Sequence, residues 1–175
     1  MNRFIDIILV SQSGFVHEVI GEVVRAITSS KYSHAAVRVF DDEPFIIEAT
    51  GDGIGKVSAD YYDNEGILKI VRIPVEEDNY QCIIDTANKL VGGKYGLDDC
   101  IIGGATDLFG DDVGEQLAAT IDVPGTLDCS ALATVMIRCE YPFYASARKP
   151  SEVTPEFINK EICDIPGAQI IIERG

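Results

Sequence analysis

The chain of 175 residues has no tryptophan, only two histidines, and 14 basic residues against 29 acidic ones. The net charge of −15 argues against nucleic acid as a partner, because phosphate binding needs clustered lysine and arginine. It also disfavours anionic membrane surfaces, and solubility alone is the ordinary explanation of such acidity. We therefore expect a partner other than nucleic acid or an anionic membrane.

Long apolar segments are also missing. No stretch is long enough to cross a bilayer, so we expect no membrane insertion. The apolar run at residues 5–10 is too short for a signal peptide and contains Asp6. We expect the chain to act where it is made, in the cytoplasm. A phage-encoded protein, or one released by lysis or packaged into a particle, stays an open alternative.

The cysteines number five, an odd count, and no two have the spacing of a metal or disulfide motif. This pattern fits reduced thiols rather than a disulfide framework. No CxxC pair and no histidine cluster indicates zinc, and we expect neither a metal nor another cofactor. The glycines at positions 51, 53 and 55 open no helix, which excludes a nucleotide-binding loop. They indicate a flexible loop, or a backbone that approaches another group closely.

Hydrophobic periodicity predicts a single domain of the α+β class, because strands and helices follow one another without regular alternation. Strands are predicted over 4–11, 33–40, 45–50, 66–73 and 168–173, and helices over 15–27, 77–91, 129–139 and 155–160. No element is predicted over 57–63. The segment at about 97–126 is predicted to be an insertion, in which 101–109 and 113–119 each fit a helix.

A candidate nucleophile stands at the start of one predicted helix. The triplet Asp128-Cys129-Ser130 leads directly into the apolar, small-residue run 131–137. Free backbone N–H groups in the first turn of a helix favour a thiolate over a thiol, and the thiolate is the nucleophile. The alternative is a small core residue, which is the commoner role of a cysteine beside an apolar helix.

A cysteine nucleophile needs a base, and the chain has two histidines to supply it. His17 falls on the polar side of the predicted helix 15–27, where a solvated surface residue is expected. His34 opens a predicted strand, and the small residues Ala35 and Ala36 leave room for another side chain beside the imidazole. The alternative for His34 is a hydrogen-bonded histidine at the end of a strand.

Glu48 is the candidate for orienting that base. It lies in an apolar strand, where a buried carboxylate needs a partner, although an outward-facing side chain is the alternative. A four-residue loop at 41–44 would place His34 and Glu48 on opposite faces of the hairpin. A five-residue loop or a bulge would place them on one face.

Two segments resemble the NlpC-type papain-like cysteine peptidases: Gly92-Gly93-Lys94-Tyr95-Gly96, and Leu127-Asp128-Cys129-Ser130-Ala131-Leu132. No histidine follows the cysteine. Instead, Tyr32-Ser33-His34-Ala35-Ala36-Val37 is similar to the histidine strand of the circularly permuted branch, the YiiX-like amidases. The segments Asp6-Ile7-Ile8-Leu9, Ile47-Glu48-Ala49 and Thr154-Pro155-Glu156 are similar to others of that branch. The chain departs from it at Ile5, where glycine is usual, and at Ala131, where glutamate is usual.

The resemblance implies a papain-like fold with a central antiparallel sheet, helices packed on it, and the nucleophile at a helix N-terminus. It also implies Cys129 as nucleophile, His34 as base and Glu48 as the orienting group. Tyr95, Ser130 and Ser33 would then contribute to substrate binding or to the oxyanion site, together with the backbone N–H of Cys129.

The reaction that this set implies is hydrolysis of an amide bond in a small peptide, for instance a cell-wall peptide, through an acyl-enzyme. One alternative is an acyltransferase or thioesterase that acts on lipid or acyl conjugates with the same residues. Another is a binding module that is no longer catalytic. The partner expected in the first two cases is a small peptide or acyl substrate, and the oligomeric state stays open.

Overall fold

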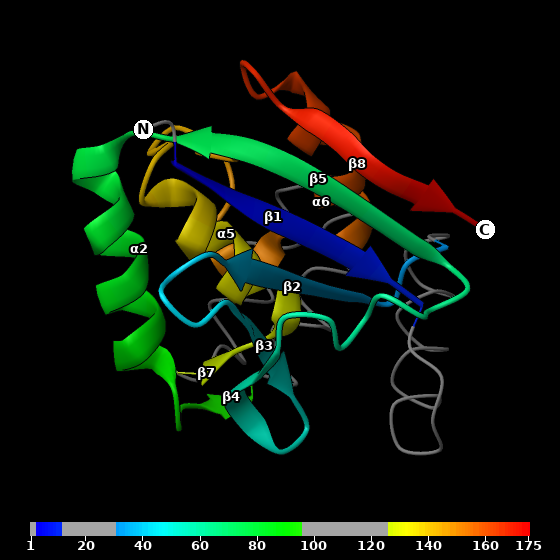
Figure 1. Cartoon of the computed structure of the whole chain (residues 1–175), viewed down its shortest axis with the longest axis horizontal. Coiled ribbons are helices and arrows are strands. Elements are labelled where there is room, and N and C mark those ends of the chain that lie inside the picture. Colours follow the sequence, from blue (N-terminus) through cyan, green and yellow to red (C-terminus); the bar gives the residue numbers. More distant parts are fainter. Residues whose placement is uncertain (1–2, 12–30, 96–125) are drawn as a thin grey trace.

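The computed structural model describes residues 3–11, 31–95 and 126–175 of the chain. Within them a twisted sheet is packed with helices (Figure 1). The elements of the first half in chain order are β1 (Arg3–Val10), β2 (His34–Val39), β3 (Phe45–Thr50), β4 (Gly53–Ser58), β5 (Leu68–Val75), α2 (Glu77–Leu90) and β6 (Lys94–Tyr95). They are followed by β7 (Thr126–Leu127), α5 (Cys129–Arg138), the 3₁₀ turn η1 (Pro150–Glu152), α6 (Pro155–Glu161), the 3₁₀ turn η2 (Ile162–Asp164) and β8 (Gln169–Arg174).

Six strands form one antiparallel sheet in the order β4-β3-β2-β1-β5-β8. The N-terminal strand β1 lies inside the sheet, between β2 and β5. The five strands predicted from the sequence are confirmed with ends within two residues, as are the predicted helices 77–91, 129–139 and 155–160. The α+β class is therefore confirmed.

Alternation along the strands divides the sheet into two faces. On one face, the side chains at positions 5, 7 and 9 of β1 join those at positions 35, 37 and 39 of β2 in the larger apolar core. Helices α2, α5 and α6 cover this face, and Ile83, Met136 and Ile158 are fully buried there. Each such side chain contributes roughly 1.5–3 kcal/mol on burial, so these contacts fix where the helices lie on the sheet.

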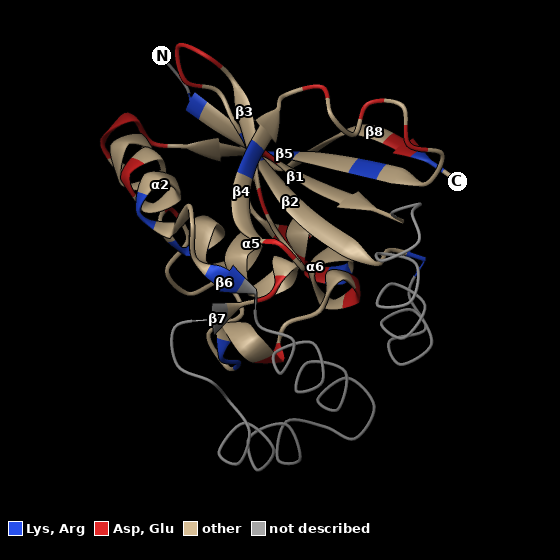
Figure 2. Cartoon of the chain, turned by 90° about the horizontal axis from the view of Figure 1, so that it is seen from below, with Lys and Arg blue, Asp and Glu red and all other residues tan. Residues whose placement is uncertain are grey.

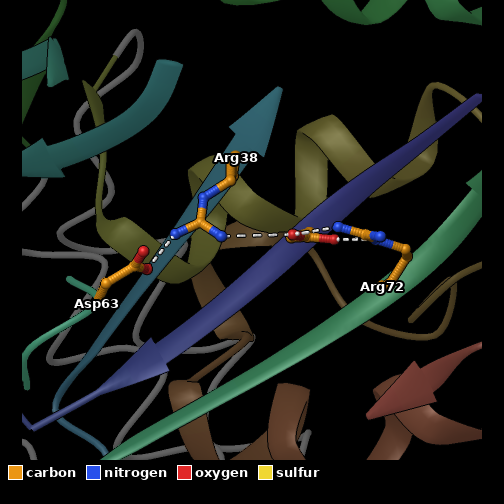
Figure 3. A network of polar contacts seen from close by, with 4 residues as sticks. Arg38, Asp63 and Arg72 are labelled. Atoms are coloured by element: carbon orange, nitrogen blue, oxygen red, sulfur yellow. Dashed lines mark hydrogen bonds and ion pairs between the residues drawn. The ribbon is translucent and has the colours of Figure 1, made fainter. Parts of the chain in front are cut away.

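The second face of the sheet carries a charged cluster (Figure 3). Asp6 of β1 is fully buried and accepts hydrogen bonds from Arg72 of β5 at 2.7 and 3.1 Å. Arg38 of β2 lies 3.6 Å from the same carboxylate and also contacts Asp63 at 2.5 Å. Because a lone buried carboxylate costs several kcal/mol, the cross-strand arginines are what allow Asp6 inside the sheet.

Figure 2 shows Asp and Glu gathered on loops and helix ends, while Lys and Arg of the described part are scattered over many elements. Exposed acids form the tip of the loop between β2 and β3, at positions 41–43, and the first turn of α2 at Glu77 and Asp78. Two acids in that first turn favour the helix, since they lie at the positive end of its dipole.

The glycine-rich segment at 51–55 is not a loop throughout, as one alternative predicted, because residues from Gly53 onward form strand β4. Its second alternative, a close backbone approach, is right. Ile54 donates its N–H to the carbonyl of Gly93 at 2.9 Å, and Gly53 has a φ of +111°. A Cβ on Gly53 would lie 2.7 Å from that carbonyl oxygen, so only glycine fits there.

Several predicted features lie outside the described residues: the helix at 15–27 with His17, the two helices at 101–109 and 113–119, and almost all of the predicted insertion at 97–126. Among the helices of the described ranges, none combines the length and the apolar character that a membrane crossing requires.

Candidate active site

Cys129 is the first residue of α5, as the sequence predicts. Asp128 precedes it in an extended conformation, with φ −78° and ψ 179°, and its carboxylate accepts the N–H of Ala131 at 2.6 Å. This is an N-cap, so the helix begins at a defined residue. The N–H groups of Cys129 and Ser130 precede the first intrahelical bond, from Leu132 N to Asp128 O at 3.0 Å. They have no carbonyl partner within the helix and so favour negative charge beside them.

Helix α5 is fixed in place because most of its side chains are buried in the core. Eight of its residues are buried, and Leu132, Met136 and Ile137 belong to the larger core. The helix packs against β2 and β3, the two strands that carry His34 and Glu48. The burial of the helix thus fixes its first residue next to the end of β2.

His34 and Glu48 lie on one face of the hairpin formed by β2 and β3. The observed register pairs Val39 with Phe45 and Val37 with Ile47, which leaves a five-residue loop at 40–44. The five-residue alternative is therefore right. His34 donates from Nε2 to Glu48 Oε2 at 3.1 Å, since an ionised carboxylate can only accept. Both side chains are more than nine-tenths buried, so this bond is shielded from water.

The other side of the imidazole meets Cys129. Burial alone lowers the pKa of His34, but the negative charge of Cys129 and a hydrogen bond with its sulfur oppose that effect. The hydrogen bond and charge of Glu48 add to them, and together they raise the pKa of His34 to about 9. Because Glu48 occupies Nε2, the ring nitrogen available to the sulfur is Nδ1. The structure thus brings together all three residues predicted from the sequence as nucleophile, base and orienting group.

Tyr62 is a member of the site that the sequence did not reveal. It is 1% exposed, its hydroxyl donates to Glu48 Oε2, and its ring centroid lies 5.8 Å from that of His34. It belongs to the stretch 57–63, for which no element was predicted. The only available signal was a large aromatic residue in a polar turn, which does not by itself indicate a site.

Two of the three predicted accessory residues, Ser130 and Ser33, are sequence neighbours of Cys129 and His34, and the third, Tyr95, pairs with the strand that precedes Cys129. Ser130 is fully buried, with its Oγ 3.9 Å from Cys129 Sγ. Ser33 is buried beside His34, and its backbone N–H is bonded to Val10 O at 2.9 Å. Tyr95 pairs through its backbone with Leu127, two residues before the cysteine, while its side chain lies outside the described residues.

No protein-family model matches the chain, and no curated protein matches it. In the described ranges, no group of three histidine, cysteine or acidic side chains is arranged to hold a metal ion.

The contacts define what the arrangement can do chemically. A sulfur at a helix N-terminus lies against an imidazole, and a buried carboxylate holds the far nitrogen of that ring. Such a set can transfer a proton from sulfur to nitrogen and keep it there as an ion pair, which is the resting state that thiol nucleophiles use.

Proposed function

We propose that the protein is a cysteine-dependent amidase or peptidase, which hydrolyses an amide bond in a small peptide through an acyl-enzyme. The observation that carries the proposal is the position of the His34 ring between Cys129 and Glu48. The charges and hydrogen bonds of Cys129 and Glu48 raise the pKa of His34 to about 9 despite its burial, which favours an imidazolium at neutral pH.

In the proposed reaction, the Cys129 thiolate attacks the carbonyl carbon and the C–N bond breaks after the tetrahedral intermediate. The His34 imidazolium gives its Nδ1 proton to the departing amine, leaving a thioester on Cys129. Neutral His34 then takes a proton from water, whose oxygen attacks the thioester and releases the acid. The backbone N–H of Cys129 stabilises the negative oxygen in both steps.

The order of the residues supports a permuted papain-like fold as part of this proposal. His34 comes from the second strand and Cys129 from a later helix, the reverse of the usual order in NlpC-type peptidases that the sequence resembles. That resemblance extends the proposal to cell-wall peptides as the substrate class.

The nucleophile is tested by alkylation with iodoacetamide at about pH 6.5, where a thiol of ordinary pKa near 8.5 is about 1% ionised. We expect Cys129 to react faster than Cys82 and Cys163 by a factor of at least about ten, although those two are exposed and Cys129 is buried. Cys139 is a matched unreactive control, because burial raises its pKa to about 11. Mass spectrometry of the digested protein assigns each label.

The His34→Ala variant should lose the preference for Cys129, because no imidazolium then stabilises the thiolate. Turnover is followed as amine release from peptide fragments of cell walls, with the Cys129→Ser variant as control. Labelling that follows exposure alone, or equal amine release by the parent and the serine variant, would contradict the proposal.

A further inference from the structure

The turn that joins β4 to β5 is itself a structured unit. Three backbone hydrogen bonds close it: Tyr61 N to Ser58 O, Asp63 N to Asp60 O, and Glu65 N to Tyr62 O, at 3.0–3.1 Å. Its neighbouring tyrosines differ sharply, since Tyr61 is 57% exposed and Tyr62 is 1% exposed. The turn therefore directs one aromatic side chain into the protein and leaves the other in solvent.

The buried tyrosine contacts both Glu48 and His34. Tyr62 donates its hydroxyl proton to Oε2 of Glu48, the oxygen that also accepts from His34 Nε2. Its ring is tilted by 48° against the imidazole. Two donors thus converge on one carboxylate oxygen, one from the base and one from the turn.

The turn is bonded to the charged cluster on the second face of the sheet through an ion pair, and to β8 through a hydrogen bond. Asp63, the next residue after Tyr62, contacts Arg38 at 2.5 Å, and Arg174 of β8 donates to the Asp63 carbonyl. Arg38 is in turn held near Asp6 (Figure 3). Arg38 and His34 lie on the same face of β2, so one strand carries both the arginine that binds Asp63 and the candidate base.

We propose that Tyr62 is a positioning residue, held by the Arg38–Asp63 pair, which keeps Glu48 ionised and thereby keeps His34 protonated against the Cys129 thiolate. The proposal rests on the proposed function, because it assigns Tyr62 a part in the same site. Of the charged and titratable groups in the described residues, His34 from β2 and Tyr62 from the turn form hydrogen bonds with this carboxylate, and Cys129 from α5 lies beyond the imidazole. Strand β4 places Gly55 opposite it.

The physical reason is that a hydrogen bond to a carboxylate favours its ionised form. In a Tyr62→Phe variant, Glu48 takes up a proton at a higher pH than in the parent. Neutral Glu48 no longer stabilises the imidazolium, and the proton on His34 then returns to the thiol. On acidification the Cys129 thiolate signal is lost at a certain pH, called here the acid limb, and this pH should rise by about one unit.

The experiment follows thiolate absorbance in the ultraviolet against pH, as the difference between each protein and its Cys129→Ser counterpart. Tyr61→Phe is the matched control, since it removes the same hydroxyl from the exposed neighbour, and its acid limb should coincide with that of the parent. In a Glu48→Gln background, Tyr62→Phe should cause no further shift, because the carboxylate through which it acts is gone.

A second pair of variants tests the same proposal if Tyr62→Phe does not fold. Asp63→Asn weakens the ion pair with Arg38, and the pH at which the Cys129 thiolate signal is lost on acidification should rise by a smaller amount than in Tyr62→Phe. Asp60→Asn removes the same charge from an exposed position of the same turn and should leave the limb in place.

The outcomes separate the two proposals. A parent without a Cys129 thiolate below about pH 7 would defeat the proposed function itself. A parent with that thiolate, and an acid limb unchanged in Tyr62→Phe or equally shifted in Tyr61→Phe, would overturn only the role of Tyr62. A Tyr62→Phe shift that persists in the Glu48→Gln background would overturn it too.

Discussion

One loop residue decides whether Glu48 reaches His34. A loop of four residues and a loop of five are equally compatible with the apolar pattern of the hairpin, and they place the two side chains on opposite faces or on one. The structure adopts the longer loop, at 40–44. The sequence could nominate both residues, because a histidine beside alanines and an acid in an apolar strand are unusual. It could not choose between the registers.

Tyr62 illustrates a second limit at this scale. Its position depends on a turn that is closed by local hydrogen bonds. The turn is also bonded to strand β2 through Arg38 and Asp63, which are 25 residues apart in the sequence. Nothing in the order of the residues 57–63 distinguishes Tyr62 from Tyr61. Only the folded sheet makes one buried and the other exposed.

The charge of Glu48 gives a prediction about pH. Because its hydrogen bond and charge raise the pKa of His34, Glu48→Gln should lower that pKa from about 9, by roughly one unit. The imidazolium attracts an anionic reagent, so the rate of Cys129 with iodoacetate relative to iodoacetamide should fall as pH rises through about 9 in the parent. The fall should come at lower pH in the variant.

Glu43→Gln, which removes an exposed acid from the tip of the same hairpin, is the control and should follow the parent. An unchanged midpoint in Glu48→Gln would show that the carboxylate does not act on the imidazole.

Among the described elements, the starts of the three helices follow directly from the sequence. The run of apolar and small residues after Asp128 fixed the start of α5, and Thr154-Pro155 fixed the start of α6, because capping residues act locally. Strand β4 was missed because its glycines hide the alternating pattern. They are required by the close approach of Gly53 to Gly93, which no local pattern reveals.

The cap of α5 should affect stability and reactivity together. Asp128→Ala removes the acceptor of the Ala131 N–H and should reduce the free energy of unfolding by about 1 kcal/mol. Fraying at this end also displaces Cys129, so its alkylation by iodoacetamide should slow by about tenfold. Asp128→Asn retains a capping oxygen and should restore most of both properties.

The matched control is Thr154→Ala, which removes the equivalent cap of α6, an acceptor of the Phe157 N–H at 3.1 Å. It should cost a similar free energy in urea unfolding and leave the alkylation rate of Cys129 unchanged. Equal slowing in both cap variants would mean that general destabilisation, and not the helix start, limits the thiol.

At the scale of the whole molecule, the sheet order was beyond the sequence. Strand β1 pairs with β2 and with β5, and the short strands β6 and β7 join segments on either side of residues 96–125. Such pairings depend on packing between distant segments rather than on local propensity. They are nevertheless what brings His34, from an early strand, against Cys129, from a late helix.

The protonation state of His34 tests its contact with Cys129 most directly. The chain has only two histidines, so imidazole nitrogen NMR gives few signals, and a His17→Gln variant assigns them. We predict that His34 is an imidazolium at neutral pH, titrates with a pKa of about 9, and shows a lower pKa in Cys129→Ser, where no thiolate faces it. A His34 that titrates near the ordinary value of 6.5 in the parent, and is indifferent to the loss of the Cys129 sulfur, would contradict the account.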